Sequence, residues 1–216
     1  LIFPAPIIMA LMLNDVRSSI YRKSIQTVVY MPHFLSVVVV VSMITIFSNK
    51  DYGLFNRIIG LFGAEPFDFM ASAKAFQPLY IFSGVWQDMG FSAIIYIAAL
   101  SSVDPQLYEA ASIDGATRMQ RILHISIPSI MGTILILFIM RIGNIMSVGF
   151  EKVLLMQNSL NSSSSEVIST FIYKYGIQNG EFSYSTAVGL FNSVINLILL
   201  ATANHFSKKA TNTSLW

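Results

Sequence analysis

Few residues in this sequence have the types and the spacing that catalysis or metal binding would require. The chain contains no cysteine, which excludes disulfides and cysteine-ligated metal centres. Its three histidines, His33, His124 and His205, are scattered without the spacing of metal ligands. The sequence has no G-x-x-x-x-G-K-[ST] phosphate-binding loop and no nucleophile–base set. We therefore predict that the chain is not an enzyme and holds no cofactor of its own.

Two ionisable residues, Asp88 and Arg141, lie inside apolar stretches, where a charge is costly unless it faces a cavity or a partner. Each lies roughly ten to thirteen residues from an end of its stretch, so at about 1.5 Å per residue both come near mid-depth of a membrane. We predict a contact between the two side chains. The alternative is that Arg141 faces a solute pathway and bonds the solute directly.

The elements that must position these residues are long apolar segments. Of the 216 residues 54% are hydrophobic and 11% are charged, and the mean hydropathy is +0.64. Soluble domains carry about 25% charged residues, so much of this surface is expected to face lipid. The net charge of +2, without a basic run, argues against nucleic-acid binding. We predict one all-α transmembrane bundle over residues 1–216, with segments at about 1–14, 27–48, 78–100, 128–149 and 184–206.

Lysines and arginines in the intervening loops predict the orientation of the segments. Loops 15–26 and 101–127 and the C-terminal tail hold seven basic residues (Arg17, Arg22, Lys23, Arg118, Arg121, Lys208 and Lys209), against five in the other loops. This bias predicts that these three regions are cytoplasmic. The first segment is shorter than the roughly 20 residues of a spanning helix, which predicts an N-terminally truncated bundle. The serines of 162–165 mark the stretch expected to be most mobile.

The loop between the third and fourth segments contains strong local signals. Asp104 is a good N-cap and Pro105 suits the first helical position, which predicts a short helix over 105–113. Gly115 can take the positive φ that ends a helix, and a second short helix is expected at about 116–124.

This helix–turn–helix would present a compact apolar face. Pro128 can begin the next spanning helix, so the pair would lie at the membrane surface. A face of this kind fits a groove on another protein, although a helix pair that only anchors the loop is the alternative. The predicted apolar face consists of Leu107, Ala110, Ala111, Ala116, Met119 and Ile122.

The same loop resembles a known family motif. Glu109-Ala110-Ala111, three further residues, Gly115, nine further residues and Ile125-x-Ile127-Pro128 are similar to the "EAA" motif of ABC importer permeases. The motif usually has leucine where this chain has Ile127. The closest likeness is to carbohydrate-type permeases of the polysaccharide branch. It is supported by residues 108–116, 149–151, 184–191 and the final Leu215-Trp216.

The resemblance implies a type I importer in a bacterial inner membrane, with a multi-pass permease subunit. Such an importer has a second, usually different permease subunit, a dimeric ATPase that binds ATP and magnesium, and an extracellular solute-binding protein. The EAA loop, residues 104–128, would dock on the ATPase. For Glu109 the alternative role is helix solubility, and for Arg118 and Arg121 it is attraction to anionic lipid. The residues implied in coupling are Glu109, Ala110, Ala111, Asp114, Gly115, Arg118 and Pro128.

A sugar pathway would need aromatic rings to stack on pyranose faces and amides to bond hydroxyls. Asn192 and Asn196 share one helix face, but asparagines in membranes commonly join helices to each other. A non-sugar solute such as a peptide or amino acid is the alternative cargo. A secondary transporter is disfavoured, because it would show internal repeats and several intramembrane carboxylates. The candidate pathway residues are Trp86, Gln87, Asp88, Arg141, Asn144, Phe150, Asn192 and Asn196.

Overall fold

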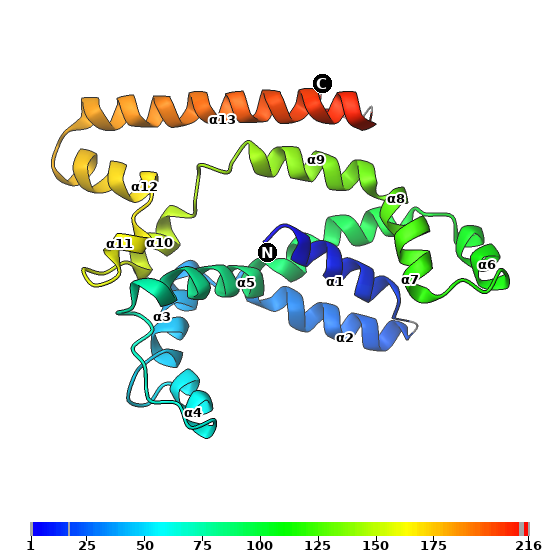
Figure 1. The fold of residues 1–216 in the computed structure, drawn as a ribbon, viewed down its shortest axis with the longest axis horizontal. Coiled ribbons are helices and arrows are strands. Elements are labelled where there is room, and N and C mark those ends of the chain that lie inside the picture. The colour runs from blue at the N-terminus through cyan, green and yellow to red at the C-terminus, as the bar shows by residue number, and fades with distance from the viewer. Residues whose placement is uncertain (1, 17, 212–213, 216) are drawn as a thin grey trace. The chain divides into compact units, whose positions relative to one another are not determined.

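The computed structural model describes residues 2–16, 18–211 and 214–215, and every regular element within them is helical (Figure 1). Leu1, Arg17 and Trp216, which the sequence argument used, lie outside the described residues. In chain order the helices are α1 (Pro4–Asn14), α2 (Ser19–Tyr30), η1 (Met31–Phe34), α3 (Val37–Phe47), α4 (Leu54–Leu61), α5 (Ala73–Ser101), α6 (Pro105–Ile113), α7 (Arg118–Arg121), η2 (Ile122–Ser126), α8 (Ile127–Ser129), α9 (Met131–Ile142), α10 (Phe150–Met156), α11 (Ser162–Ser165), α12 (Ile168–Phe171), η3 (Ile172–Gln178) and α13 (Phe182–Thr211).

Two helices, α5 and α13, are by themselves long and apolar enough to cross a membrane. Two further spans are possible only as bent pairs. The helix Ser19–Phe34 meets Val37–Phe47 at 99°, and Arg118–Ser129 meets Met131–Ile142 at 64°. The predicted segments 27–48 and 128–149 are therefore not straight helices.

The first bend has a local cause in the sequence. Pro32 lies in the 3₁₀ turn η1, where its missing N–H removes one helical hydrogen bond. Ser36 then starts a new helix, because its side chain accepts a hydrogen bond from Val39 N at 3.3 Å. Hydropathy alone does not register either event, so the sequence analysis joined the two helices into one segment.

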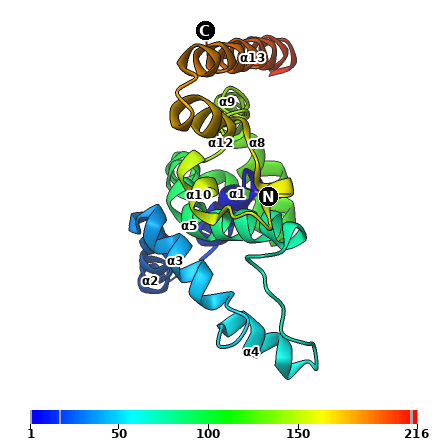
Figure 2. The same ribbon diagram turned by 90° about the vertical axis from the view of Figure 1, so that its left-hand side faces the viewer.

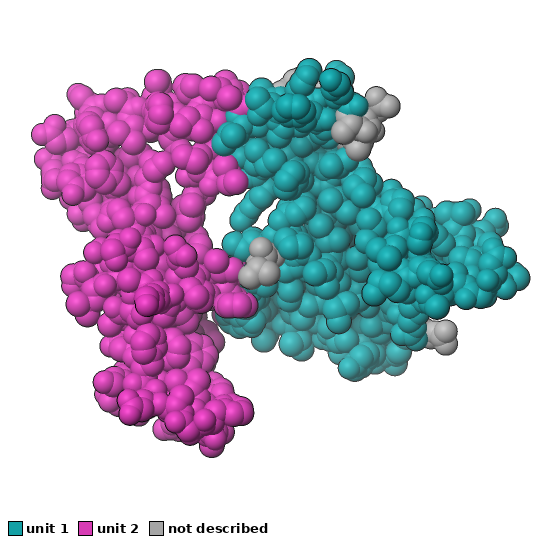
Figure 3. Space-filling view, viewed as in Figure 1, with its two compact units in different colours: residues 1–33, 85–143, 199–216 teal, residues 34–84, 144–198 magenta. Residues whose placement is uncertain are grey.

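Unit 1 of the two compact units comprises residues 1–33, 85–143 and 199–216 (Figure 3, teal). Its core is formed where α1 and α9 pack on the second half of α5. The close approach of α2 to α5 depends on Gly90, where a Cβ would collide with the carbonyl of Val29. The buried apolar residues of this core are Ala10, Ala93, Tyr96, Leu100 and Ile130.

Unit 2 comprises residues 34–84 and 144–198 (Figure 3, magenta). In this unit α10 packs against α3 and the first part of α5, and α4 follows α3 through a short turn (Figure 2). Lys152, which lies between the predicted segments 128–149 and 184–206, is buried in α10 with its Nζ 5.4 Å from the Tyr80 ring centre. The buried core of unit 2 consists of Val40, Val41, Ile44, Phe76, Val153 and Met156.

The serine stretch 162–165 in unit 2 is a helical turn, α11, and not an open loop. Ser165 is fully buried and donates to Asn161 Oδ1 at 3.0 Å, and Ser164 donates to the Ala73 carbonyl at 2.6 Å. The first bond is local, and the second reaches backbone 91 positions away. A helical turn with a buried serine and such bonds differs from the mobile stretch that was predicted, because its hydroxyls bond protein groups instead of water.

Candidate functional site

Loop 104–128 begins with the short helix that its sequence predicts. The Asp104 side chain accepts a hydrogen bond from Gln106 N at 2.9 Å, and Pro105 occupies the first position of α6. The helix ends at Ile113, and Gly115 has a φ of +77°. The predicted helix over 105–113 and the glycine break are both confirmed.

The second helix of the loop differs from its prediction. Thr117 and Gln120 form a capping box that starts α7, a signal that the sequence analysis did not use. The α7 helix passes directly into the π-helix η2 and then α8, which contains Pro128. Helical structure therefore runs beyond the predicted end at about 124, and α9 begins only at Met131.

The exposed face of the loop contains half of the predicted apolar residues. Glu109, Ala110, Leu107 and Met119 are exposed, whereas the predicted members Ala111, Ala116 and Ile122 are half-buried. The most exposed apolar side chain is one that the sequence analysis missed, Ile113, at 86%. Its position just before the Asp114–Gly115 break was the available signal, since a residue at a helix end projects beyond the last turn.

Side-chain bonds hold this loop together from inside. The Tyr108 hydroxyl lies 3.0 Å from Ser126 Oγ, which joins α6 to η2. Arg121 donates to Ser112 Oγ at 2.8 Å and thereby joins α7 to α6. The two helices are thus fixed to each other, so that a force on α6 would be passed to the helices that follow.

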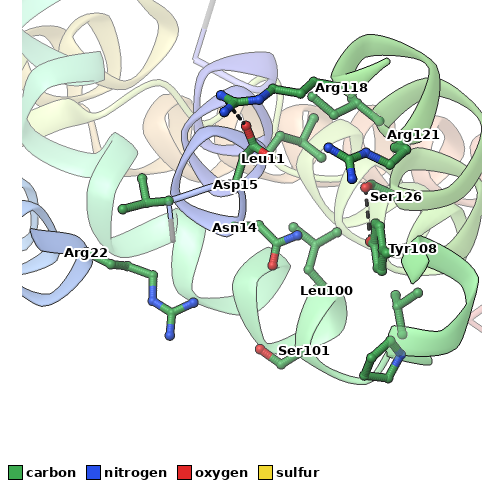
Figure 4. Close-up of a pocket in the computed structure, with 14 residues that line it drawn as sticks. Leu11, Asn14, Asp15, Arg22, Leu100, Ser101, Tyr108, Arg118, Arg121 and Ser126 are labelled. Carbon is green, nitrogen blue, oxygen red and sulfur yellow. Dashed lines mark hydrogen bonds and ion pairs between the residues drawn. The ribbon is translucent and has the colours of Figure 1, made fainter. Parts of the chain in front are cut away.

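Behind the loop lies a polar cavity of about 500 Å³ (Figure 4). The ends of α1 and α5, the start of α2, and the loop itself form its walls. Arg118 in this cavity makes an ion pair with Asp15 at 3.1 Å, which joins the loop to the end of α1. The charged lining residues are Asp15, Arg22, Arg118 and Arg121.

Residues 2–212 match a described protein family, the "binding-protein-dependent transport system inner membrane component" family. The chain belongs to this family. The family resemblance predicted from the sequence is thereby confirmed.

This chain is similar to one curated relative and to two solved structures. It is 45% identical over 207 residues to the polygalacturonan/rhamnogalacturonan transport system permease protein YteP of Bacillus subtilis (strain 168), covering 96% of this chain and 64% of that protein. A bacterial ABC transporter involved in the import of the acidic polysaccharide alginate has a chain of the same fold, with a TM-score of 0.94 at 42% identity, over 97% of this chain and 73% of that one. A second structure is the bacterial alginate ABC transporter in complex with an alginate pentasaccharide-bound periplasmic protein. One of its chains has a TM-score of 0.96 at 41% identity, over 99% of this chain and 74% of that one. These matches confirm the predicted all-α, type I importer permease fold.

The candidate pathway residues of this inner membrane component fall into two groups of four, one in each unit. Trp86, Gln87, Asp88 and Arg141 belong to unit 1. Trp86, Asp88 and Arg141 are exposed on the chain, whereas Gln87 is buried. The unit 2 group is Asn144, Phe150, Asn192 and Asn196.

The predicted Asp88–Arg141 ion pair is not present among the described residues. Asp88 Oδ1 instead lies 3.0 Å from His33 Nδ1, and the His33 ring stacks on Phe91 with centroids 4.0 Å apart and planes at 6°. The bend at η1 brings His33 to α5, and this bend was not predicted. The sequence analysis, which considered His33 only as a possible metal ligand, therefore missed the partner of Asp88.

In unit 2 Asn196 links α13 to the non-helical connection between α9 and α10. It accepts a hydrogen bond from Met146 N at 3.3 Å and donates one to Ser147 Oγ at 3.4 Å, so it joins a helix to a turn and not to another helix. The Oδ1 atom of Asn192 is buried. Phe150 meets Tyr173 edge-on, with ring centroids 5.3 Å apart.

Proposed function

We propose that this chain is part of a multi-pass permease subunit of an ATP-driven, binding-protein-dependent importer in a bacterial inner membrane. The chain spans about two thirds of the curated relative's length, at 64%. The observation that carries the proposal is the exposed surface of loop 104–128, where α6 presents Leu107, Glu109 and Ile113 and α7 presents Met119. A face of this kind suits insertion into a groove of a separate ATPase.

Force would enter through this loop and reach the membrane helices. ATP and magnesium would be held by the partner ATPase dimer, and closure of that dimer would pull on α6. Because Tyr108 and Arg121 bind α6 to α7 and η2, the pull passes along the continuous path η2–α8–α9. Ala110, Ala111, Asp114 and Gly115 shape the inserted surface, and Pro128 lies on the outgoing path.

The remaining partners follow from the same reading. An extracellular solute-binding protein would deliver the solute, and a second, different permease subunit would complete the path. In α13 every residue of an 18-residue apolar window is at least partly exposed within this chain. Apolar side chains such as Leu190 and Phe191 there are available to the second subunit or to lipid.

The proposed cargo is an oligosaccharide or a polysaccharide fragment. Its support is the likeness to relatives that are described as transporting polygalacturonan/rhamnogalacturonan and alginate. A non-sugar solute such as a peptide remains the second candidate. Binding-protein-stimulated ATP hydrolysis by the reconstituted importer, measured with uronate oligosaccharides, neutral oligosaccharides and peptides, decides between them.

The coupling role is tested by reversing the charge of Glu109. In the reconstituted importer we expect Glu109→Lys to lower solute-stimulated ATP hydrolysis about tenfold, since one charge at a buried contact commonly controls docking. The control is Glu65→Lys, the same charge reversal at an exposed residue between α4 and α5. Unchanged coupling in Glu109→Lys, with normal membrane insertion, would overturn the assignment of the loop.

A further inference from the structure

The polar cavity behind loop 104–128 lies where helices of unit 1 end. It is lined by the last residues of α1, such as Asn14, the last residue of α5, Ser101, and the first turn of α2. Long apolar helices thus give way to polar loops at this level, and a membrane–water boundary is expected there. The volume of about 500 Å³ is in the range of ligand-binding cavities.

The charges of this cavity are unbalanced. Asp15 is the one acidic lining residue, and it pairs with Arg118 at 3.1 Å. Arg121 donates to the neutral hydroxyl of Ser112. Among the described residues, no carboxylate lies within ion-pair distance of Arg22 or Arg121, so the lining carries two uncompensated guanidinium groups. A guanidinium binds phosphate oxygens through paired hydrogen bonds.

Apolar groups lie next to these arginines. Leu11, Leu100 and Val103 line the cavity together with the charged residues. Leu11 and Val103 are only half-buried, so the acyl chains of a lipid would cover them, whereas a soluble phosphate gains nothing from them.

We propose that this cavity binds the phosphate of an anionic phospholipid headgroup, with Arg22 as its ligand and Arg121 as a second positive charge on the opposite wall. Basic pockets between membrane helices on the cytoplasmic side bind anionic headgroups in this way. Figure 4 shows the Arg22 and Arg121 side chains on opposite sides of the cavity, with Asn14 between them. A lipid held there would contact α1, α2 and the loop at once and would stabilise the position of the loop against the membrane.

The test compares two adjacent basic residues of α2, one arginine and one lysine. Arg22 is half-buried and lines the cavity, whereas its neighbour Lys23 is exposed and does not line it, although both are basic residues at nearly the same depth. The complete importer carrying Arg22→Gln or Lys23→Gln is stripped of lipid and given back phosphatidylglycerol, phosphatidylcholine or inorganic phosphate. Bound lipid is counted by native mass spectrometry.

We expect the wild type and Lys23→Gln to retain phosphatidylglycerol about fivefold better than Arg22→Gln, and all three to retain phosphatidylcholine equally weakly. Equal phosphatidylglycerol retention by Arg22→Gln and Lys23→Gln would overturn the proposal. Displacement of phosphatidylglycerol by millimolar inorganic phosphate would overturn the lipid as source and leave a phosphate site. The measurement uses neither solute nor nucleotide, so it is independent of whether the proposed transport function holds.

Discussion

Two regions of this chain lie between long helices and are built on opposite principles. The proposed coupling loop, residues 104–128, has no buried residue in α6 or α7 and, apart from the Arg118–Asp15 ion pair, is shaped by bonds within itself. The packed segment, residues 150–178, buries polar residues and bonds to backbone up to 91 positions away. The surface that we propose for a partner keeps its shape mainly through its own bonds, whereas the packed segment depends on contacts with residues distant in the sequence.

The largest expected effect is in the packed segment, at Asn161. This residue is 1% exposed, donates to the Met70 and Met156 carbonyls at 2.9 and 3.0 Å, and accepts from Ser165. Each buried group left without a partner costs about 1–3 kcal/mol, so we expect Asn161→Ala to lower the free energy of unfolding by about 3 kcal/mol.

Thermal unfolding of the purified complex measures this loss. The control is Ser159→Ala at an exposed position of the same segment, with an expected change within about 0.5 kcal/mol. If both variants unfold together with the wild type, the packed segment does not depend on its long-range bonds and the contrast with the coupling loop fails.

Local features such as those of loop 104–128 could be predicted from the sequence, whereas features that depend on packing between helices could not. The bounds of the helix 105–113 and the positive φ of Gly115 were predictable, because an N-cap, a proline and a glycine act on their own neighbours. The burial of Lys152 and the pairing of His33 with Asp88 were not. Each depends on which helix packs alongside, and hydropathy does not carry that information.

The two regions also differ in what a methyl group would meet at a glycine. At Gly176 in the packed segment a Cβ would collide with the Ser185 side chain, whereas at Gly115 it would meet nothing within 4 Å. We expect Gly176→Ala to cost about 2 kcal/mol from overpacking. Gly115→Ala should cost about 1 kcal/mol from its backbone conformation alone.

Thermal unfolding ranks these two variants, and Gly115→Asn isolates the backbone term. Asparagine tolerates a left-handed conformation better than alanine, so it should recover part of the stability lost at Gly115. An equal loss in Gly115→Ala and Gly115→Asn would show that the open space at this turn is occupied in the assembled importer.

A smaller effect is expected from the hydroxyl that joins the two helices of the coupling loop. Tyr108→Phe removes the bond to Ser126, whose side chain is 2% exposed, and should cost about 1 kcal/mol. Hydrogen exchange of the α6 amides should become faster in this variant. The double variant Tyr108→Phe/Ser126→Ala should recover part of the loss, because it leaves no hydroxyl without a partner. Unchanged exchange in both would mean that the loop is held by backbone geometry alone.

The smallest expected effects concern two ion pairs, one from each region. Arg118–Asp15 in unit 1 and Lys174–Glu166 in the packed segment have the same N–O distance of 3.1 Å. Their side chains differ in exposure, at 68% and 39% for the first pair and 34% and 38% for the second. Solvent screens an exposed pair more strongly, so double-mutant cycles should give about 0.3 kcal/mol for Arg118–Asp15 and closer to 1 kcal/mol for Lys174–Glu166. Raising the salt concentration to about 1 M should remove the first coupling and leave part of the second. A larger coupling energy for Arg118–Asp15 would reverse the comparison, because the coupling loop would then depend on its contact with α1 and not on its own internal bonds.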